Sequence, residues 1–166
     1  MIIGLDPGKE PGICIIDSRG EYVHSLLVKT TKSKEFDHKQ LSDILLLLDR
    51  DYDIREAYME LPHSVFGVGA KSNFTFGYAV GACRQALESR FSTTLFKPKE
   101  WQKKLIIEED VVKVGKKKDT KKTAANTARR LLGDKWDEEG IFIPPRGRVK
   151  NHNLIDAYLI GKAGQV

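Results

Sequence analysis

The stretch MIIGLDPGKEPGICIID, residues 1–17, decides the fold of this chain. The apolar run "IIGL" ends at Asp6, "PG" turns the chain, and the strand-like run "ICII" follows almost at once. An aspartate before Pro-Gly is a common turn residue. It is equally the place where a rigid strand would hold a carboxylate at the edge of a sheet. The choice between these readings depends on whether other carboxylates reach Asp6.

Short apolar runs separated by polar turns continue through the first part of the chain. Residues 1–5, 12–17 and 22–28 predict an antiparallel meander. Leu41, Ile44, Leu45 and Leu48 recur at helical spacing. The predicted elements that follow the meander are a helix at 36–50, a strand at 54–61, a helix at 76–90, a strand at "STTLFKP" and helices at 99–105, 120–132 and 153–163. This order predicts an α/β protein with a mixed sheet and helices on its faces.

The composition is that of a globular protein with an anionic partner. The 166 residues are enough for one domain, 1–166, with its own core. A formal net charge of +5 favours an anionic partner, although charge alone is weak evidence. Cys14 and Cys83 lie far apart and are predicted to be reduced core residues, with no zinc-binding pattern. Residues 113–122 resemble a linker, and 144–150 form a second irregular piece.

No targeting or membrane segment is evident in the sequence. The N-terminal apolar run is broken by Asp6, which argues against a signal peptide. The longest apolar stretch, "ILLLL" at residues 44–48, is far too short to span a bilayer. The sequence therefore predicts a cytoplasmic protein that does not bind membranes.

Acidic residues occupy the ends of two predicted strands. Asp6 ends the first strand, and Glu60 ends the strand at 54–61. If these strands are parallel neighbours, the two carboxylates lie about one strand spacing, ~5 Å, apart. Two like charges at that distance call for a counter-cation. Oxygen ligands of this kind suit Mg²⁺ or Mn²⁺.

A third acid, Asp156, lies among apolar residues in "HNLIDAYLIG". A carboxylate on a buried helix needs a partner or a function. His152 and Asn153 fall on the same helical side and are further candidate ligands. Each residue also has a simpler interpretation: Asp6 as a turn residue, Glu60 as an exposed strand end, Asp156 as an ion-pair partner of a lysine and Asn153 as a helix N-cap. Together they favour a metal site, since the simpler interpretation requires several coincidences.

These motifs resemble those of the RuvC-like Holliday junction resolvases of the ribonuclease H superfamily, particularly the compact phage-type members. The matching stretches are "IIGLDPGKEPGICIID", "YMELPHSVFGVGAKSNFTFGYAVGACRQAL" and "HNLIDAYLIG", with "GKKKDTKKTAANTARRLLG" between the last two. The resemblance extends from residue 1 to about residue 164. It implies a ribonuclease H-like mixed sheet of five strands, the first three antiparallel and the others parallel. For a phage-encoded member, the expected location is the bacterial host cytoplasm.

The resemblance also implies an activity and a ligand set. Asp6, Glu60 and Asp156 would hold two Mg²⁺ or Mn²⁺ ions, and Asn153 takes the position of the family's usual fourth ligand, with His152 beside it. Two such ions suit hydrolysis of phosphodiesters in a four-way DNA junction, leaving 5′-phosphate and 3′-hydroxyl ends. Paired nicks across a symmetric junction imply a homodimer. An asparagine at the fourth position departs from the family pattern.

Candidate DNA contacts follow Glu60 and fill the basic segment. Phe66 is predicted to wedge into or stack on unpaired bases, with burial as the alternative, while Phe74 and Phe76 are predicted core residues. Lys121 or Lys122 would stabilise charge at the scissile phosphate, as a basic residue of this region does in the family. The predicted DNA contacts are His63, Phe66, Lys71, Lys116, Lys117, Lys118, Lys121 and Lys122, in a basic stripe that also includes Lys97, Lys99, Lys103, Lys104, Lys113, Arg129 and Arg130. A solvated loop is the alternative for a lysine run.

Two alternative functions remain open from the sequence. One is a nuclease of the same superfamily that acts on flap or other branched DNA or on RNA–DNA hybrids. The other is a junction-binding protein without catalysis, for which Asn153 is the one supporting feature.

Overall fold

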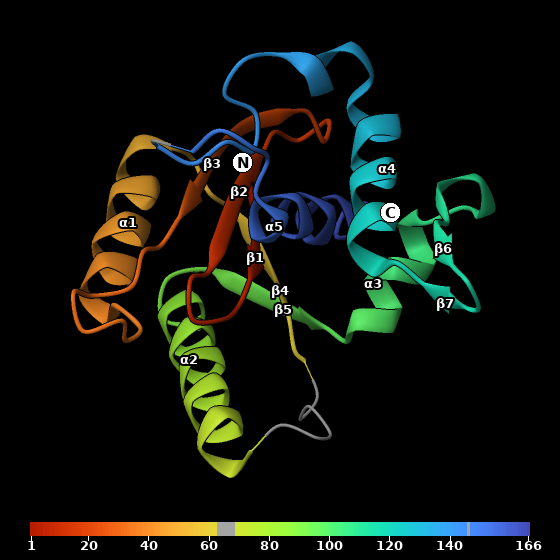
Figure 1. Ribbon diagram of the computed structural model, residues 1–166. Helices are drawn as coiled ribbons and strands as arrows, with labels where there is room; N and C mark the ends of the chain where they lie inside the picture. Colours follow the sequence, from red (N-terminus) through yellow and green to blue (C-terminus); the bar gives the residue numbers. More distant parts are fainter. Residues whose placement is uncertain (63–68, 146) are drawn as a thin grey trace.

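The computed structural model describes residues 1–62, 69–145 and 147–166. Its centre is a five-stranded sheet in the order β3-β2-β1-β4-β5 (Figure 1). β1 pairs antiparallel with β2 and β2 with β3, whereas β1–β4 and β4–β5 are parallel. The strands are β1 Ile2–Asp6, β2 Gly12–Ile16, β3 Tyr22–Leu27, β4 Glu56–Glu60 and β5 Ser92–Phe96. The predicted fold class, a meander extended by parallel strands, is confirmed.

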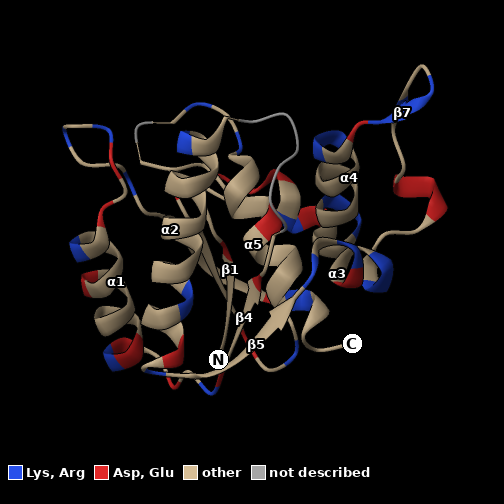
Figure 2. Cartoon of the chain, turned by 90° about the horizontal axis from the view of Figure 1, so that it is seen from below, with Lys and Arg blue, Asp and Glu red and all other residues tan. Residues whose placement is uncertain are grey.

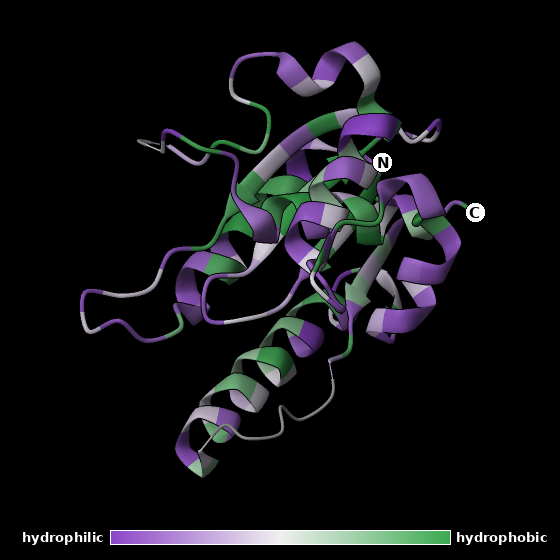
Figure 3. Cartoon of the chain, turned by 45° about the vertical axis from the view of Figure 1, so that its right-hand side comes forward, coloured by the Kyte–Doolittle hydropathy of each residue, from purple (hydrophilic) through white to green (hydrophobic). Residues whose placement is uncertain are grey.

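Helices cover both faces of the sheet and divide the core into two parts. α1 (His38–Asp51) and α2 (Ala70–Glu88) pack on one face. α5 (His152–Ala163) crosses the other face, with α3 (Pro98–Leu105) and α4 (Thr120–Leu132) packed outside it. Figure 3 shows hydrophobic residues concentrated along the sheet and the helix on it, with hydrophilic residues in the outer segments. No helix among the described residues is long and apolar enough to cross a membrane.

Glycines allow α5 to lie directly on the sheet. A Cβ atom at Gly4 of β1 would lie 2.0 Å from the carbonyl oxygen of Ala157 and 2.5 Å from the backbone nitrogen of Gly161. A Cβ atom at Gly12 of β2 would lie 2.1 Å from the carbonyl oxygen of Asn153. Real side chains cannot occupy this space. α5 is therefore fixed against β1 and β2 from its first turn to its third, beside Asp6.

Substitution of Gly4 by alanine is expected to destabilise the fold strongly. The added methyl group meets backbone atoms of α5, which cannot rotate away, so α5 has to move off the sheet. Overpacking of this kind costs about 1–3 kcal/mol or more. We expect a clear fall in the midpoint of thermal unfolding, measured by circular dichroism. An unchanged midpoint would mean that the contact between α5 and β1 is not tight.

Two segments differ from the sequence-based prediction. α2 begins at Ala70 rather than at residue 76, so Phe74 lies on the helix with 77% of its surface exposed, and its prediction as a core residue is wrong. Phe76, by contrast, packs against the core. Residues 113–122, expected to be linker, form the hairpin β6 (Lys113–Val114) and β7 (Lys117–Lys118) and then enter α4. Gly115 has a φ of 61°, which a two-residue hairpin turn favours.

Two short elements remain, one between α3 and β6 and one between α4 and α5. They are the 3-10 helices η1 (Glu108–Asp110) and η2 (Gly133–Asp137). The irregular character expected of 144–150 holds for its described residues. Cys14 and Cys83 are both buried and free, as predicted.

Candidate active site

The alternation of side chains along two neighbouring strands points Asp6 and Glu60 to the α5 face of the sheet. On β1, Leu5 packs toward α1 and α2, so Asp6 projects to the opposite face. On β4, Met59 packs toward α1 and α2, and Glu60 follows it. Leu5 lies opposite Met59 in the parallel ladder, so the next residue of each strand is an acid at the same edge.

Asp156 approaches this edge from α5. Most of the helix is buried, including both neighbours of this residue, Ile155 and Ala157. Burial first and then the charge of Glu60 raise the pKa of Asp156 to about 7, with Lys121 opposing the rise. Burial and then the charges of Asp156 and Glu60 hold the pKa of Asp6 well above its usual range. The three carboxylates therefore repel one another in a partly desolvated site.

Glu60 has a specific hydrogen-bond partner. The indole Nε1 of Trp101 on α3 donates to Glu60 Oε2 at 2.5 Å. Burial raises the pKa of Glu60, and the indole hydrogen bond partly offsets the rise. The indole is buried and orients a carboxylate of the site, through a contact between residues 41 positions apart that no local pattern of the sequence indicates.

Glu60 and Asp156 line a small cavity of about 170 Å³, which we call the carboxylate pocket. Lys121, on the first turn of α4, lines the same cavity and is the basic residue that lowers the pKa of Asp156. Lys122 instead lies 3.8 Å from Asp119, the N-cap residue of α4. Of the two predicted lysines, Lys121 is the one that the structure brings to the carboxylates. The full lining is Glu60, Pro98, Trp101, Gln102, Ile106, Lys118, Thr120, Lys121, Ala124 and Asp156.

The two candidates for a fourth ligand point to different places. The side-chain amide of Asn153 donates to the carbonyl oxygen of Glu10 at 2.7 Å, which ties α5 to the β1–β2 turn. Its proposed role as N-cap is wrong, because Asn151 caps α5. His152 has a buried Nδ1 with no hydrogen-bond partner in the described part of the chain. Burial and then Lys121 lower the pKa of His152, so this ring lies on the α4 side.

The predicted DNA contacts occupy separate surfaces. Lys116 and Lys117 are exposed on the β6–β7 hairpin, and Lys118 lines the carboxylate pocket. Figure 2 shows basic residues on β7, on α3 and at the start of α4. Lys71 lies on α2, beside a different hollow. His63 and Phe66 lie outside the described residues.

Some of the basic stripe is occupied by internal contacts. Arg130 forms a salt bridge with the buried Asp110 at 2.8 Å. Arg129 lies over the ring of Trp136, and Lys104 donates to the carbonyl oxygens of Ala163 and Val166. These three residues of the stripe therefore already have partners within the protein.

The carboxylates of Asp6, Glu60 and Asp156 are chemically suited to a hard divalent cation. Among the residues that the structure describes, however, no group of three His, Cys, Asp or Glu side chains is gathered closely enough to hold a metal ion. The raised pKa values of Asp6, Glu60 and Asp156 have burial as their main cause, and mutual repulsion adds to it for Asp6 and Asp156. A bound cation would relieve both costs, and carboxylate oxygens are the ligands that Mg²⁺ and Mn²⁺ prefer.

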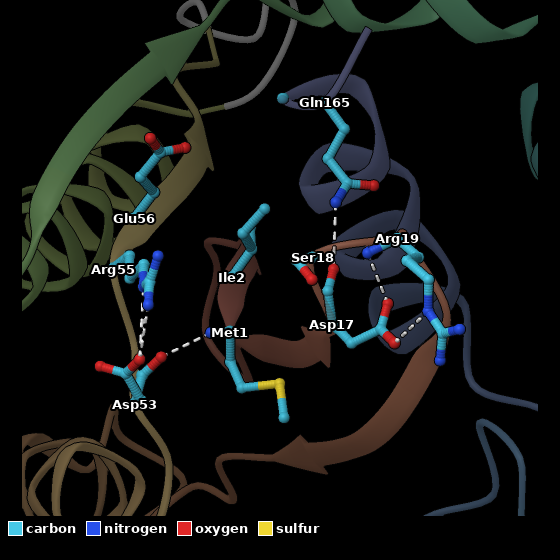
Figure 4. A pocket seen from close by; sticks show the side chains of 10 residues that line it. Met1, Ile2, Asp17, Ser18, Arg19, Asp53, Arg55, Glu56 and Gln165 are labelled. Carbon is cyan, nitrogen blue, oxygen red and sulfur yellow. Dashed lines mark hydrogen bonds and ion pairs between the residues drawn. The ribbon is translucent and has the colours of Figure 1, made fainter.

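A larger hollow of about 680 Å³ lies at the opposite end of the sheet (Figure 4). Its charged groups satisfy one another: Arg19 pairs with Asp17, and Arg55 pairs with Asp53. The N-terminal amine donates to the carbonyl oxygen of Asp53. Because these charges are already paired, the larger hollow is a weaker candidate than the carboxylate pocket.

Comparison with known proteins gives matches in structure only. No protein-family model matches the chain, and no curated protein matches it in sequence. Thermus thermophilus RuvC in complex with a Holliday junction substrate matches with a TM-score of 0.64 and 17% identity, over 98% of this chain and 90% of that chain. A second structure of Thermus thermophilus RuvC matches with a TM-score of 0.59 and 19% identity, over 98% and 91%. The chain therefore has the ribonuclease H-like fold of RuvC structures.

Proposed function

We propose that the protein is a structure-selective DNA endonuclease that resolves four-way junctions by metal-dependent phosphodiester hydrolysis, leaving 5′-phosphate and 3′-hydroxyl ends. One observation carries the proposal: Asp6 and Glu60 end neighbouring parallel strands at one edge of the sheet, and Asp156 of α5 lies close enough for its charge to raise the pKa of Asp6 and for Glu60 to raise its own. The fold adds support, since one structure that shares it is RuvC bound to a Holliday junction substrate.

The carboxylates and Lys121 would have different roles in such a site. Asp6, Glu60 and Asp156 would hold two Mg²⁺ or Mn²⁺ ions, which supply an activated water and charge stabilisation when bound. His152 keeps a buried Nδ1 without a partner among the described residues and so retains a ligand atom, whereas the Asn153 amide is engaged with Glu10. Lys121 would contact the scissile phosphate. β1, β4 and α5 are rigid supports, so the side chains need little reorganisation.

Replacement of Trp101 by phenylalanine is expected to weaken the site without unfolding it. The aromatic ring is retained, but Glu60 loses the N–H donor that orients it. Loss of such an outer partner typically costs about 10–100-fold in metal affinity or activity. The measurement is the Mn²⁺ dependence of junction cleavage. Trp136→Phe, a change at a second buried indole away from the carboxylates, is the matched control. Equal effects of the two variants would contradict the role of Trp101.

The test of the proposed function is cleavage of four labelled substrates in Mg²⁺ or Mn²⁺. These are a four-way junction, a flap, a linear DNA duplex and an RNA–DNA hybrid. Paired symmetric nicks in the junction support resolution. Preferred cutting of the hybrid or flap would instead support the alternative ribonuclease H-like activity. Tight junction binding with no cutting in either metal would make the protein a junction-binding module.

The proposal includes a homodimer, because paired nicks on a symmetric junction need two active sites. α2 offers a surface for a second copy: Phe74 is 77% exposed and Tyr78 is 56% exposed. Gly77 and Gly81 have open space around them, which allows a helix to approach closely. Exposed aromatic groups of this kind often mark interfaces.

A Phe74→Ser/Tyr78→Ser variant is therefore expected to be monomeric where the wild-type chain is dimeric. Sedimentation velocity at several protein concentrations measures the change. A Leu46→Ser/Leu47→Ser variant is the matched control, since α1 exposes these two apolar side chains to a similar degree. If the α1 variant dissociates while the α2 variant remains dimeric, the dimer interface lies on α1 instead.

A further inference from the structure

A second hollow adjoins the carboxylate pocket. It has a volume of about 670 Å³ and lies between α3 and the β6–β7 hairpin. Gln102, Ile106 and Lys118 line both hollows, so the two meet along these side chains. We call the second hollow the lysine groove; its lining is Gln102, Lys103, Ile106, Ile107, Glu108, Val111, Lys113 and Lys118. The groove leads outward from the carboxylates.

The walls of the lysine groove carry an uncompensated positive charge. Lys113 and Lys118 lie directly opposite each other in the β6–β7 ladder, an arrangement that costs stability. Neither forms a salt bridge with any described acidic residue, and Lys103 on α3 is equally without one. Glu108 is the one acid among the described lining residues. A bound polyanion would relieve the repulsion between the two hairpin lysines.

The floor of the lysine groove is apolar. Ile107 is 43% exposed, which is unusual for a large aliphatic side chain beside lysines, and Ile106 and Val111 are half-buried. In a DNA duplex the base faces are stacked away from the protein, whereas an unpaired strand presents them. A groove with basic walls and an apolar floor therefore fits an unpaired strand, with its phosphates on the lysines and its bases on the floor.

α4 fixes the lysine groove in place. The buried carboxylate of Asp110 accepts hydrogen bonds from Nε and Nη2 of Arg130 and from the hydroxyl of Thr127. The same Nη2 donates to the carbonyl oxygen of Leu105, and the Thr123 hydroxyl accepts from the backbone nitrogen of Val112. α4 also presents Lys121 to the carboxylates at its first turn. One helix thus aligns the groove with the carboxylate pocket.

We propose that the lysine groove holds an unpaired DNA strand next to the phosphate at the carboxylates, through phosphate contacts from Lys103, Lys113 and Lys118. This proposal rests on the proposed function, which identifies the cleaved strand as DNA. It accounts for selectivity toward branched DNA in physical terms, since strands at a branch point, where base stacking is interrupted, unpair more readily than strands within an intact duplex. An intact duplex would have to open before it could enter the groove.

The first test measures binding of a fluorescent oligothymidylate to the full chain by anisotropy in metal-free buffer, at several salt concentrations. A Lys103→Gln/Lys113→Gln variant is compared with a Lys29→Gln/Lys32→Gln control, whose lysines lie on the loop between β3 and α1. Each phosphate contact adds about 0.7 to the salt slope for a single strand. We expect the groove variant to lose about 1.4 from that slope, which is roughly 25-fold in affinity at 0.1 M salt. Equal salt slopes for the two variants would overturn the proposal that the lysine groove binds the strand.

A second test replaces Ile107 by photoreactive benzoylphenylalanine. Crosslinking to the oligothymidylate but not to a blunt duplex of equal length is expected. Equal crosslinking of the duplex would overturn the unpaired-strand assignment. Both tests are independent of cleavage. Strand binding in the groove without any junction cutting would refute the proposed nuclease function but support the strand-binding role of the groove. Binding and cutting by the groove variant at wild-type levels would refute the role of the groove but support the nuclease function.

Discussion

The Asp6→Asn variant is expected to lose nearly all junction cleavage while it still binds junctions. The pKa of Asp6 is raised well above its usual range, first by burial and then by both other acids. An amide keeps the shape of the side chain but removes the charge that would hold a cation. The loss should exceed the ~10–100-fold that removal of an outer-shell partner typically costs. Cleavage of a labelled junction under single-turnover conditions measures it.

The same substitution is expected to raise the stability of the metal-free protein at pH 8. It removes one of three mutually repelling carboxylates from a partly desolvated site, as the pKa shifts of Asp6 and Asp156 indicate. Asp49→Asn, a change at an exposed carboxylate on α1, is the control and should alter neither cleavage nor stability. A variant that is inactive and also unstable would point to a structural role for Asp6 instead.

The arrangement of the main elements could be predicted because the relevant signals are local. The alternating strands of residues 1–28 and the two strand-terminal acids are visible along the chain, and parallel pairing of β1 with β4 then brings Asp6 and Glu60 to one edge. The close approach of α5 is also encoded, in Gly4 and Gly12, but only the structure shows which backbone atoms occupy the space.

The sequence could not separate lysines and arginines with different tasks. Residues 113–122 have the composition of a linker, yet Gly115 and the cap Asp119 shape them into a hairpin and a helix start. Arg130 resembles another phosphate contact until its buried partner Asp110 is known. The contact from Trp101 to Glu60 was missed for the same reason. Pairings between distant residues depend on tertiary packing, which local composition does not record.

The metal-free protein is expected to lose stability between pH 5 and pH 8. The pKa of Asp156 is about 7 in the folded state against 3.8 as its ordinary value, so in this range the folded chain keeps a proton that the unfolded chain has released. Stability then falls as pH rises and levels off above pH 7. The free energy of unfolding falls by about 3 kcal/mol, which lowers the midpoint of thermal unfolding by roughly 6–12 °C. Asp6 acts in the same direction, whereas the lowered pKa of His152 opposes it.

Subtracting the pH profile of an Asp156→Asn variant from that of the wild type leaves the contribution of Asp156 together with its coupling to Asp6 and Glu60, because the His152 contribution is common to both. Addition of Mn²⁺ at pH 8 should restore the lost stability to the wild type, by about 2.7 kcal/mol at a metal concentration 100 times the dissociation constant. The variant should respond much less. A difference profile that is flat, or a midpoint that Mn²⁺ leaves unchanged, would mean that the carboxylates do not form a cation site. Since repulsion among buried acids is costly in the empty site, the same charges that destabilise the free protein would provide the affinity for the metal.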